Sequence, residues 1–217
     1  MSWVFRDRAQ AGEMLASRLA GYAHRDGVTV LALPRGGVPV AYPIAQALDA
    51  PLDILGVRKL GVPGHEELAM GAIAAGGIRV LNQDVVSRLA IDPATIDAAA
   101  RVERHRLAEQ QGRFRGNRPA APREGRLVVL VDDGLATGST MEAAIASCRL
   151  ARVAGIIVAV PVGARETVAH LTTRADEIVC LAQPAVFRAV GLAYQDFAAV
   201  ADEEVVALLN AAARPRW

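Results

Sequence analysis

The amino-acid sequence predicts an α/β protein: a doubly wound, mainly parallel, open sheet of about five strands flanked by helices. Short apolar runs of strand length alternate along the chain with Ala-rich segments of helical length. Of the 217 residues, 53% are hydrophobic but only 4% are aromatic. A core of small aliphatic side chains suits a parallel sheet buried on both faces. The length and the lack of repeats predict a single domain over residues 1–217.

The boundaries of the expected elements follow from prolines, glycines and polar residues. Strands are expected at residues 28–33, 51–57, 127–131, 155–160 and 177–182. Helices are expected at residues 6–24, 37–48, 92–112, 139–150, 165–173 and 202–213. Residues 58–82 are Gly-rich and predict a flexible loop, in which 68–75 and 78–81 are candidate hairpin strands.

The most informative segment joins the strand at 127–131 to the helix at 139–150. Asp132 and Asp133 stand at the carboxyl end of the strand, and a loop of small residues follows. Gly134 and Gly138 allow a tight turn and a close approach to a ligand. Free amides at the start of the helix favour an anion, and hydroxyl donors stand beside them at Thr137, Ser139 and Thr140. The loop can hold a phosphate, while the two acids can hold hydroxyl groups or a metal.

Other interpretations of this segment fit less well. An ordinary strand-to-helix turn needs one capping residue, Thr137 or Ser139, and explains neither the two acids nor the further hydroxyls. A Walker loop needs Gly-Lys-Ser/Thr, and a dinucleotide fingerprint needs G-x-G-x-x-G; the segment has neither. A phosphatase with Asp132 as nucleophile would need a D-x-D pattern, whereas the acids here are adjacent.

Residues 128–140, VVLVDDGLATGST, resemble the phosphoribosyl-pyrophosphate (PRPP) motif of type I phosphoribosyltransferases. The whole chain resembles an uncharacterised bacterial branch of that family through four further motifs: Phe5-Arg6-Asp7-Arg8, Ala189-Val190-Gly191, Asp196-Phe197 and Asp202-Glu203-Glu204-Val205. The resemblance implies the type I fold, Mg²⁺ as cofactor, and transfer of a phosphoribosyl group to a nitrogenous base with release of pyrophosphate. Asp132 and Asp133 would bind the ribose hydroxyls, directly or beside Mg²⁺. The 5′-phosphate loop would comprise Gly134, Ala136, Thr137, Gly138, Ser139 and Thr140.

A second glycine-bearing loop, Arg35-Gly36-Gly37, follows the first expected strand. Two backbone amides beside a guanidinium form a cradle suited to a diphosphate. The loop resembles the pyrophosphate loop of the family. The alternative is a tight turn into a helix, with the glycines needed only for backbone angles. Because the carboxyl ends of parallel strands meet at one edge, three segments are expected to converge there: Pro34 to Val38, Arg58 to Gly77, and Asp132 to Thr140.

Two adjacent cations, Arg58 and Lys59, follow the expected strand at 51–57. Positive charge there would neutralise a leaving pyrophosphate. The family carries a mobile loop at this point that closes over the substrate. Lys59 is therefore predicted to be catalytic together with Asp132 and Asp133, and Arg58 to support pyrophosphate binding. The alternative is a solvated surface pair.

The tail from residue 184 to 217 would contribute a small hood over the acceptor, as the family resemblance implies. Phe187, Tyr194 and Phe197 offer rings on which a planar base could stack, and Asp196 could accept hydrogen bonds from ring nitrogens. Equally, the rings could pin the tail to the core. In the resembled branch the position of Ala193 is often Trp, so this chain has one ring fewer there.

Composition also limits the possible partners and the cellular location of the protein. The net charge of +1 gives no general attraction to nucleic acid or anionic membranes. No apolar run is long enough to cross a bilayer, and the N-terminus lacks the apolar core of a signal peptide. Cys148 and Cys180 are expected to be reduced, which fits the cytoplasm. Ala-rich helices favour a homodimer.

One basic segment leaves an alternative function open. It contains Arg101, Arg104, Arg106, Arg113, Arg115 and Arg118. Its only aromatic residue is Phe114, so base-stacking platforms are lacking and nucleic-acid binding is not expected. The alternative is a non-catalytic regulator that senses PRPP or a nucleotide and engages RNA or a protein through this segment. The sequence does not identify the acceptor base.

Overall fold

The computed structural model describes residues 4–74, 77–116 and 118–213. Its strands are β1 Val28–Ala32, β2 Leu52–Ile54, β3 Val57–Val62, β4 His65–Ala74, β5 Ile78–Leu81, β6 Leu127–Val131, β7 Gly155–Val162 and β8 Glu177–Ala182. Its α-helices are α1 Arg8–Arg18, α2 Gly37–Leu48, α3 Gln83–Arg88, α4 Pro93–Arg115, α5 Ser139–Leu150, α6 Arg165–Leu171 and α7 Asp202–Ala212. Short 3₁₀ helices, η1 and η2, cover Ala20–Tyr22 and Val190–Ala193.

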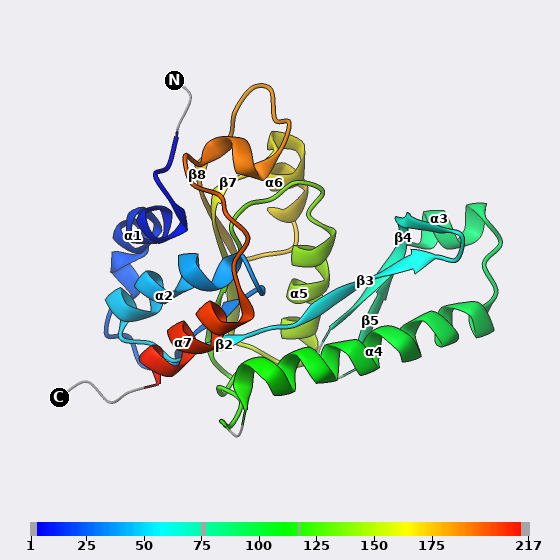
Figure 1. Cartoon of the computed structure of the whole chain (residues 1–217), viewed down its shortest axis with the longest axis horizontal. Helices are drawn as coiled ribbons and strands as arrows, with labels where there is room; N and C mark the ends of the chain where they lie inside the picture. Colours follow the sequence, from blue (N-terminus) through cyan, green and yellow to red (C-terminus); the bar gives the residue numbers. More distant parts are fainter. Residues whose placement is uncertain (1–3, 75–76, 117, 214–217) are drawn as a thin grey trace.

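Five parallel strands form the central sheet in the order β2-β1-β6-β7-β8. Helices α1 and α2 cover one face, and α5 and α6 cover the other (Figure 1). This arrangement confirms the predicted fold class. In the pairing of β1 with β6, Ala32 lies beside Val131. The loops that follow these two strands therefore leave the same edge of the sheet as neighbours.

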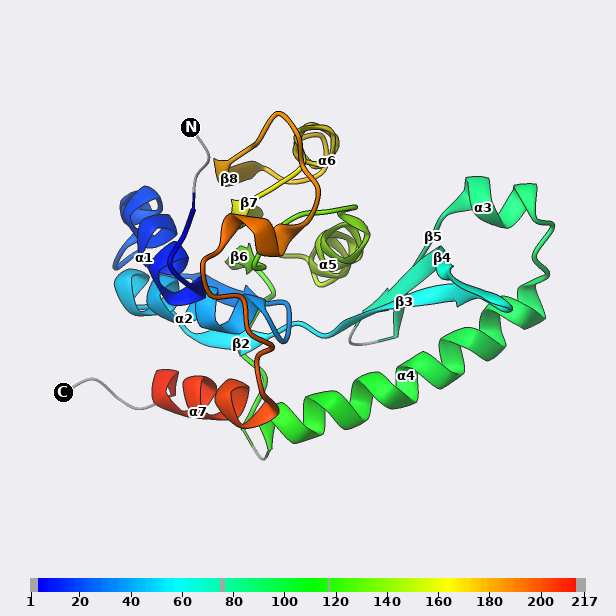
Figure 2. The ribbon, with the colours of Figure 1, turned by 45° about the horizontal axis from the view of Figure 1, so that its top comes forward.

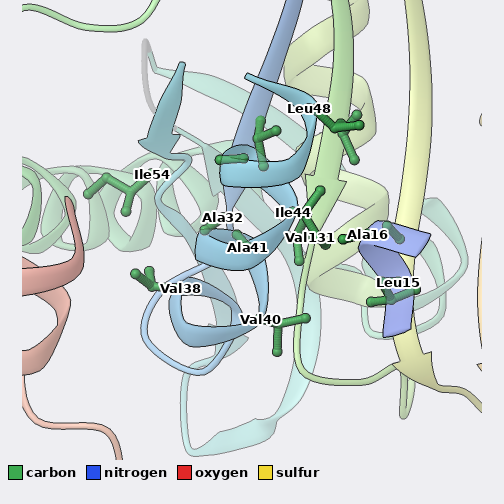
Figure 3. Close-up of a cluster of buried hydrophobic side chains, with 14 of the residues drawn as sticks. Leu15, Ala16, Ala32, Val38, Val40, Ala41, Ile44, Leu48, Ile54 and Val131 are labelled. Atoms are coloured by element: carbon green, nitrogen blue, oxygen red, sulfur yellow. The ribbon is translucent and has the colours of Figure 1, made fainter. Parts of the chain in front are cut away.

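The core consists mainly of aliphatic side chains on both faces of this sheet. On the α2 face, Val38, Ala41 and Ile44 pack among β1, β6 and α1 (Figure 3). On the opposite face, Leu31, Leu130 and Val158 pack against α5 and α6. Strand β7 is buried along its whole length, as expected for a central parallel strand. This packing fixes the strand ends that carry the candidate site.

A second, antiparallel sheet of order β3-β4-β5 extends away from the central sheet and is supported by α4 (Figures 1 and 2). We call β3, β4, β5, α3 and α4 the arm. Leu60, Met70 and Ile73 of its strands are buried against Ile96 and Ala100 of α4. A small sheet is stable in water only when its hydrophobic face is packed, and the apolar face of α4 covers that face here.

The arm corrects part of the sequence-based prediction. The expected strand at 51–57 ends at Ile54, and Val57 begins the new sheet. Within the expected flexible loop at 58–82, the candidate hairpin strands at 68–75 and 78–81 correspond to β4 and β5. Strand β3 was not expected, and Arg58 and Lys59 lie within it. Alternating small and apolar residues bury one face of β3 and β4 on α4. Ala75, placed in a hairpin strand by the sequence, lies outside the described residues.

Smaller differences concern the ends of elements. The helix expected at 6–24 stops at Arg18 and continues as η1. Strand β7 runs through Pro161 to Val162, and α4 extends to Arg115, with Asp92 accepting the Thr95 amide as its N-terminal cap. Helix α3 was not predicted. In the part of the chain that the structure describes, no helix combines the length and apolar character needed to cross a membrane.

Candidate functional site

The two glycine-bearing loops meet at the carboxyl edge of the central sheet. A Cβ atom at Gly36 would lie 2.0 Å from Oδ2 of Asp133, and one at Gly37 would lie 2.6 Å from the carbonyl oxygen of Val131. Only glycine allows so close an approach without displacing a neighbour. The predicted convergence of the Arg-Gly-Gly loop and the two acids is therefore present in the structure. The peptide bond between Pro34 and Arg35 is cis.

The two acids have different partners. The Asp133 carboxylate accepts a hydrogen bond from Nε of Arg8 at 2.9 Å, and both side chains are largely buried. The Asp132 carboxylate accepts the backbone amide of Asp133 at 2.9 Å. Among the described residues, no cationic side chain pairs with Asp132. Asp132 is thus the acid whose charge is left without a counterion.

This arrangement shifts the pKa of both carboxyl groups. Burial, reinforced by the nearby charge of Asp133, raises the pKa of Asp132 well above its ordinary value. Burial also raises the pKa of Asp133, although the hydrogen bond and charge of Arg8 act in the opposite direction. A buried pair of like charges favours a ligand that supplies hydroxyl donors or a cation.

The loop between the acids and α5 has the backbone of an anion site. Gly138 adopts a left-handed conformation, with φ of +76°, immediately before α5 begins at Ser139. The first amides of a helix lack intrahelical acceptors and favour an anion. The hydroxyls of Thr137 and Ser139 lie 3.3 Å apart, and the Thr167 hydroxyl fixes the loop by donating to the Ala136 carbonyl at 2.6 Å. Ala136 and Thr137 are exposed at the tip of this turn, whereas the other predicted loop residues are half-buried.

The two cations predicted from the sequence have different environments. Arg58 pairs with Glu103 of α4. Lys59 is exposed and has no partner among the described residues. It lines an open hollow of about 600 Å³ that also borders Arg106 and Thr140. Lys59 therefore shares a hollow with the phosphate loop, although it lies on a strand and not on a loop.

Arg35 turns toward α7. Its guanidinium lies 3.4 Å from the carboxylate of Asp202, which also accepts a hydrogen bond from Arg113. In this structure the contact between the Arg-Gly-Gly loop and the acids is made by the glycine backbone. The Arg35 side chain remains half exposed at the rim.

The tail anchors itself to the acid loop. Tyr194 is buried, packs against Phe5 and stacks on Phe197, and its hydroxyl donates to the Asp133 carbonyl at 2.6 Å. Phe187 joins the same cluster. Phe197 keeps 36% of its surface exposed, and Asp196 is exposed and accepts the Ala198 amide. Tyr194 therefore pins the tail to the core, and the ring of Phe197 is already contacted by Tyr194 and by the guanidinium of Arg8.

Two contacts of the site were missed by sequence reasoning. Arg8 lies 125 positions before Asp133, and Val190 of η2 packs over Gly134, where a Cβ would approach its side chain to 2.6 Å. Both residues lie in motifs that carry the family resemblance, but nothing in the sequence places either one beside the acid loop. Only the packing of the N-terminal segment and the tail across the sheet edge brings them to the acid loop.

Most of the basic segment is engaged within the chain. The partners are Glu103 for Arg106, Asp202 for Arg113, Asp53 for Arg115, and the Phe114 and Arg115 carbonyls for Arg118. Arg101 and Arg104 are exposed and have no partner in the described part of the chain. Little of this charge is therefore free to attract nucleic acid.

Comparisons with known proteins agree with this geometry. A family model described as "Phosphoribosyl transferase domain" matches residues 6–196. A Mycobacterium tuberculosis protein provisionally named a phosphoribosyl transferase is 50% identical over 214 residues, which are 97% of this chain and 47% of that protein. The chain thus spans about half the length of the curated relatives it matches.

Solved structures share the fold. A crystal structure of a Thermus thermophilus protein has a TM-score of 0.84 and 44% identity, covering 95% of this chain and 97% of that one. The structure of an Aquifex aeolicus protein is 13% identical, with a TM-score of 0.50, and the match covers 80% of this chain and 73% of that protein's chain. At this identity the likeness shows the fold alone. The family match over most of the chain carries the assignment: this protein belongs to the phosphoribosyl transferase family.

Proposed function

We propose that the protein binds Mg²⁺–PRPP and transfers the phosphoribosyl group to a nitrogen of a base, with release of pyrophosphate. The observation that carries this proposal is the packing of Gly36 against Asp133. It brings a diphosphate-sized backbone cradle to an acid pair, and α5 begins directly beyond. Sites for a diphosphate, a sugar and a phosphate therefore adjoin one another.

In this proposal the chain positions its substrate and stabilises charge. Asp132 and Asp133 hold the ribose hydroxyls, and the loop from Gly134 to Thr140 holds the 5′-phosphate. The amides of Gly36 and Gly37, with Arg35, Arg58 and Lys59 near the edge, receive the pyrophosphate. As the bond to pyrophosphate breaks, positive charge develops on the sugar and negative charge on the leaving group. Preorganised donors stabilise the latter.

The residues present fit a magnesium ion. Mg²⁺ prefers oxygen ligands and is usually bound through one or two carboxylates together with substrate phosphates and waters. Asp132 is half-buried, and its carboxylate lacks a cationic partner among the described residues. No cluster of three or more metal-binding side chains occurs in that part of the chain, which suits an ion that arrives with its substrate. When bound, the ion would neutralise phosphate charge.

We propose that the central sheet and the arm form one domain. Helix α5 contacts all three strands of the arm as well as β6. Ser139 lines a hollow of about 440 Å³ together with Gly71 and Leu81 of the arm. The arm thus adjoins the phosphate loop, and there it would shield a bound sugar from water. Excluding water there would protect the developing sugar cation from hydrolysis.

Turnover tests the proposal. The purified protein is incubated with Mg²⁺–PRPP and, one at a time, a panel of purine and pyrimidine bases, and pyrophosphate release is followed. We expect release with at least one base and none with Asp132→Asn. Saturable PRPP binding without release for any base would instead favour a sensing regulator, and salt-dependent RNA binding would strengthen that interpretation.

A further inference from the structure

We infer that Arg8 is a positioning residue: it orients the Asp133 carboxylate toward the ribose and ties it to the C-terminal tail. This inference rests on the function proposed above and adds a residue to that site. Arg8 is the first residue of α1 and lies outside both the Arg-Gly-Gly loop and the acid loop. Three contacts made by its guanidinium carry the argument.

The first contact fixes one carboxylate oxygen. Nε of Arg8 donates to Oδ2 of Asp133 at 2.9 Å, and the two side chains are only 11% and 17% exposed. The same oxygen is the atom nearest to Gly36. Among the described residues, no side chain other than Arg8 donates a hydrogen bond to the Asp133 carboxylate. Arg8 therefore occupies one oxygen and leaves the other for a hydroxyl donor.

The second and third contacts join Arg8 to the tail. Its Nη1 donates to the Ala198 carbonyl at 2.9 Å, and its guanidinium carbon lies 3.8 Å from the centre of the Phe197 ring. A guanidinium over an aromatic face gains both stacking and electrostatic attraction. One planar group thus contacts the acid loop and the tail at once, a geometry that a lysine cannot reproduce in full.

Tyr194 also joins Asp133 to the tail, through the backbone of Asp133. Its hydroxyl donates to the backbone carbonyl of Asp133, and its ring stacks on Phe197 with centroids 5.0 Å apart. Backbone hydrogen bonds from Phe5 to Ala193 and from Gln195 to Phe5 hold the N-terminal segment against the tail. Asp133 is therefore held at its side chain by Arg8 and at its backbone by Tyr194.

The test compares Arg8→Met, Arg8→Lys and a matched control, Arg6→Met. The Arg6 side chain is exposed and, among the described residues, pairs with its neighbour Asp7 alone, so its loss removes no contact of the site. Binding of Mg²⁺–PRPP is measured by calorimetry, and KM for PRPP and kcat are measured with an active base. At metal sites, loss of a residue that orients a metal-binding side chain typically lowers affinity or activity by about ten- to a hundredfold.

We expect Arg8→Met to weaken PRPP binding and raise its KM at least about tenfold. Arg8→Lys should restore part of the affinity because it returns the charge without the planar stacking, and Arg6→Met should match the wild type. A merely structural arginine would lower the melting temperature while leaving the KM of the folded fraction unchanged, which would overturn the inference.

A further variant covers the case in which Arg8→Met does not fold. Tyr194→Phe removes only the hydroxyl that holds the Asp133 carbonyl, and we expect it to weaken PRPP binding by a few-fold. Unchanged affinity in both Tyr194→Phe and Arg8→Lys would overturn the inference. If the wild type itself bound no PRPP, the proposed function would fail first, so the two failures are distinguishable.

Discussion

Gly36 and Asp133 are in such close contact that a methyl group on Gly36 would lie 2.0 Å from the carboxylate oxygen Oδ2. The two residues come from loops that follow neighbouring parallel strands, β1 and β6. Their contact brings the backbone cradle and the acid pair together at the sheet edge. The site therefore depends on the absence of a side chain at Gly36 as much as on the presence of the acids.

Replacing Gly36 with Ala tests this contact. The added methyl group must displace Asp133, and overpacking of this kind costs about 1–3 kcal/mol. We expect a lower melting temperature and markedly weaker PRPP binding. Gly21→Ala is the matched control, because nothing lies within 4 Å of its Cβ position. Equal behaviour of the two variants in calorimetry and thermal unfolding would show that Asp133 tolerates the methyl group.

The raised pKa of Asp132 predicts how stability depends on pH. The folded protein retains this proton to higher pH than the unfolded chain does, because burial and Asp133 disfavour the charge. The free energy of unfolding should therefore fall as the pH rises from the ordinary carboxyl range through the raised pKa. Above that pKa, Asp132→Asn should be more stable than the wild type, although it binds no PRPP.

Urea unfolding between about pH 4 and pH 8 measures this dependence. The matched control is Asp26→Asn, since Asp26 is exposed. We expect the control to follow the wild-type curve, whereas Asp132→Asn lies above it at neutral pH. A less stable Asp132→Asn at neutral pH would mean that the carboxylate has a favourable partner in the folded protein.

Lys59 and Arg58 should respond differently to removal of their charge. Lys59 is exposed and lacks a partner among the described residues, so Lys59→Met should leave the free energy of unfolding within about 0.5 kcal/mol of wild type. If it neutralises pyrophosphate, kcat should fall about a hundredfold. Arg58→Met loses the pair with Glu103 and should lower stability. If kcat is unchanged in Lys59→Met, as expected for the control Arg101→Met, then Lys59 is a solvated surface residue with no part in catalysis.

An ion pair outside the predicted site should matter for stability alone. Asp53 is 7% exposed and accepts hydrogen bonds from two nitrogens of Arg115 and from the Ala121 amide. Removing one partner of a buried pair costs about 3 kcal/mol or more. Arg115→Met should therefore lower the denaturant midpoint without changing PRPP affinity, whereas Arg104→Met should change neither. A loss of less than about 0.5 kcal/mol would mean that water replaces the arginine.

The sequence predicted the central sheet because its strands are short, continuous apolar runs closed by Pro, Gly or acids. The limits of α2 and β8 and the start of α5 coincide with such boundaries. The arm was harder to predict, since its strands contain glycines and alanines that also suit a loop. Residues 51–57 were wrongly joined into one strand, because a change of sheet at Leu55 and Gly56 leaves no polar marker.

The candidate site also contains parts that the sequence predicts and parts that it does not. The acid pair, the phosphate loop and the Arg-Gly-Gly loop are local motifs that the sequence displays, and parallel pairing brings them together. Arg8 and Tyr194 reach Asp133 only through tertiary packing. Arg35 resembled a ligand of pyrophosphate, but its partner in the structure is Asp202. A motif shows which residue types stand together, whereas the direction of a long side chain depends on distant partners.

Calorimetric titration of the folded protein with Mg²⁺–PRPP tests the central claim most directly. We expect a saturable heat of binding for the wild type and no such heat for Asp132→Asn, with that variant still folded. Absence of heat for the folded wild type at millimolar PRPP, or equal affinity of wild type and Asp132→Asn, would contradict it.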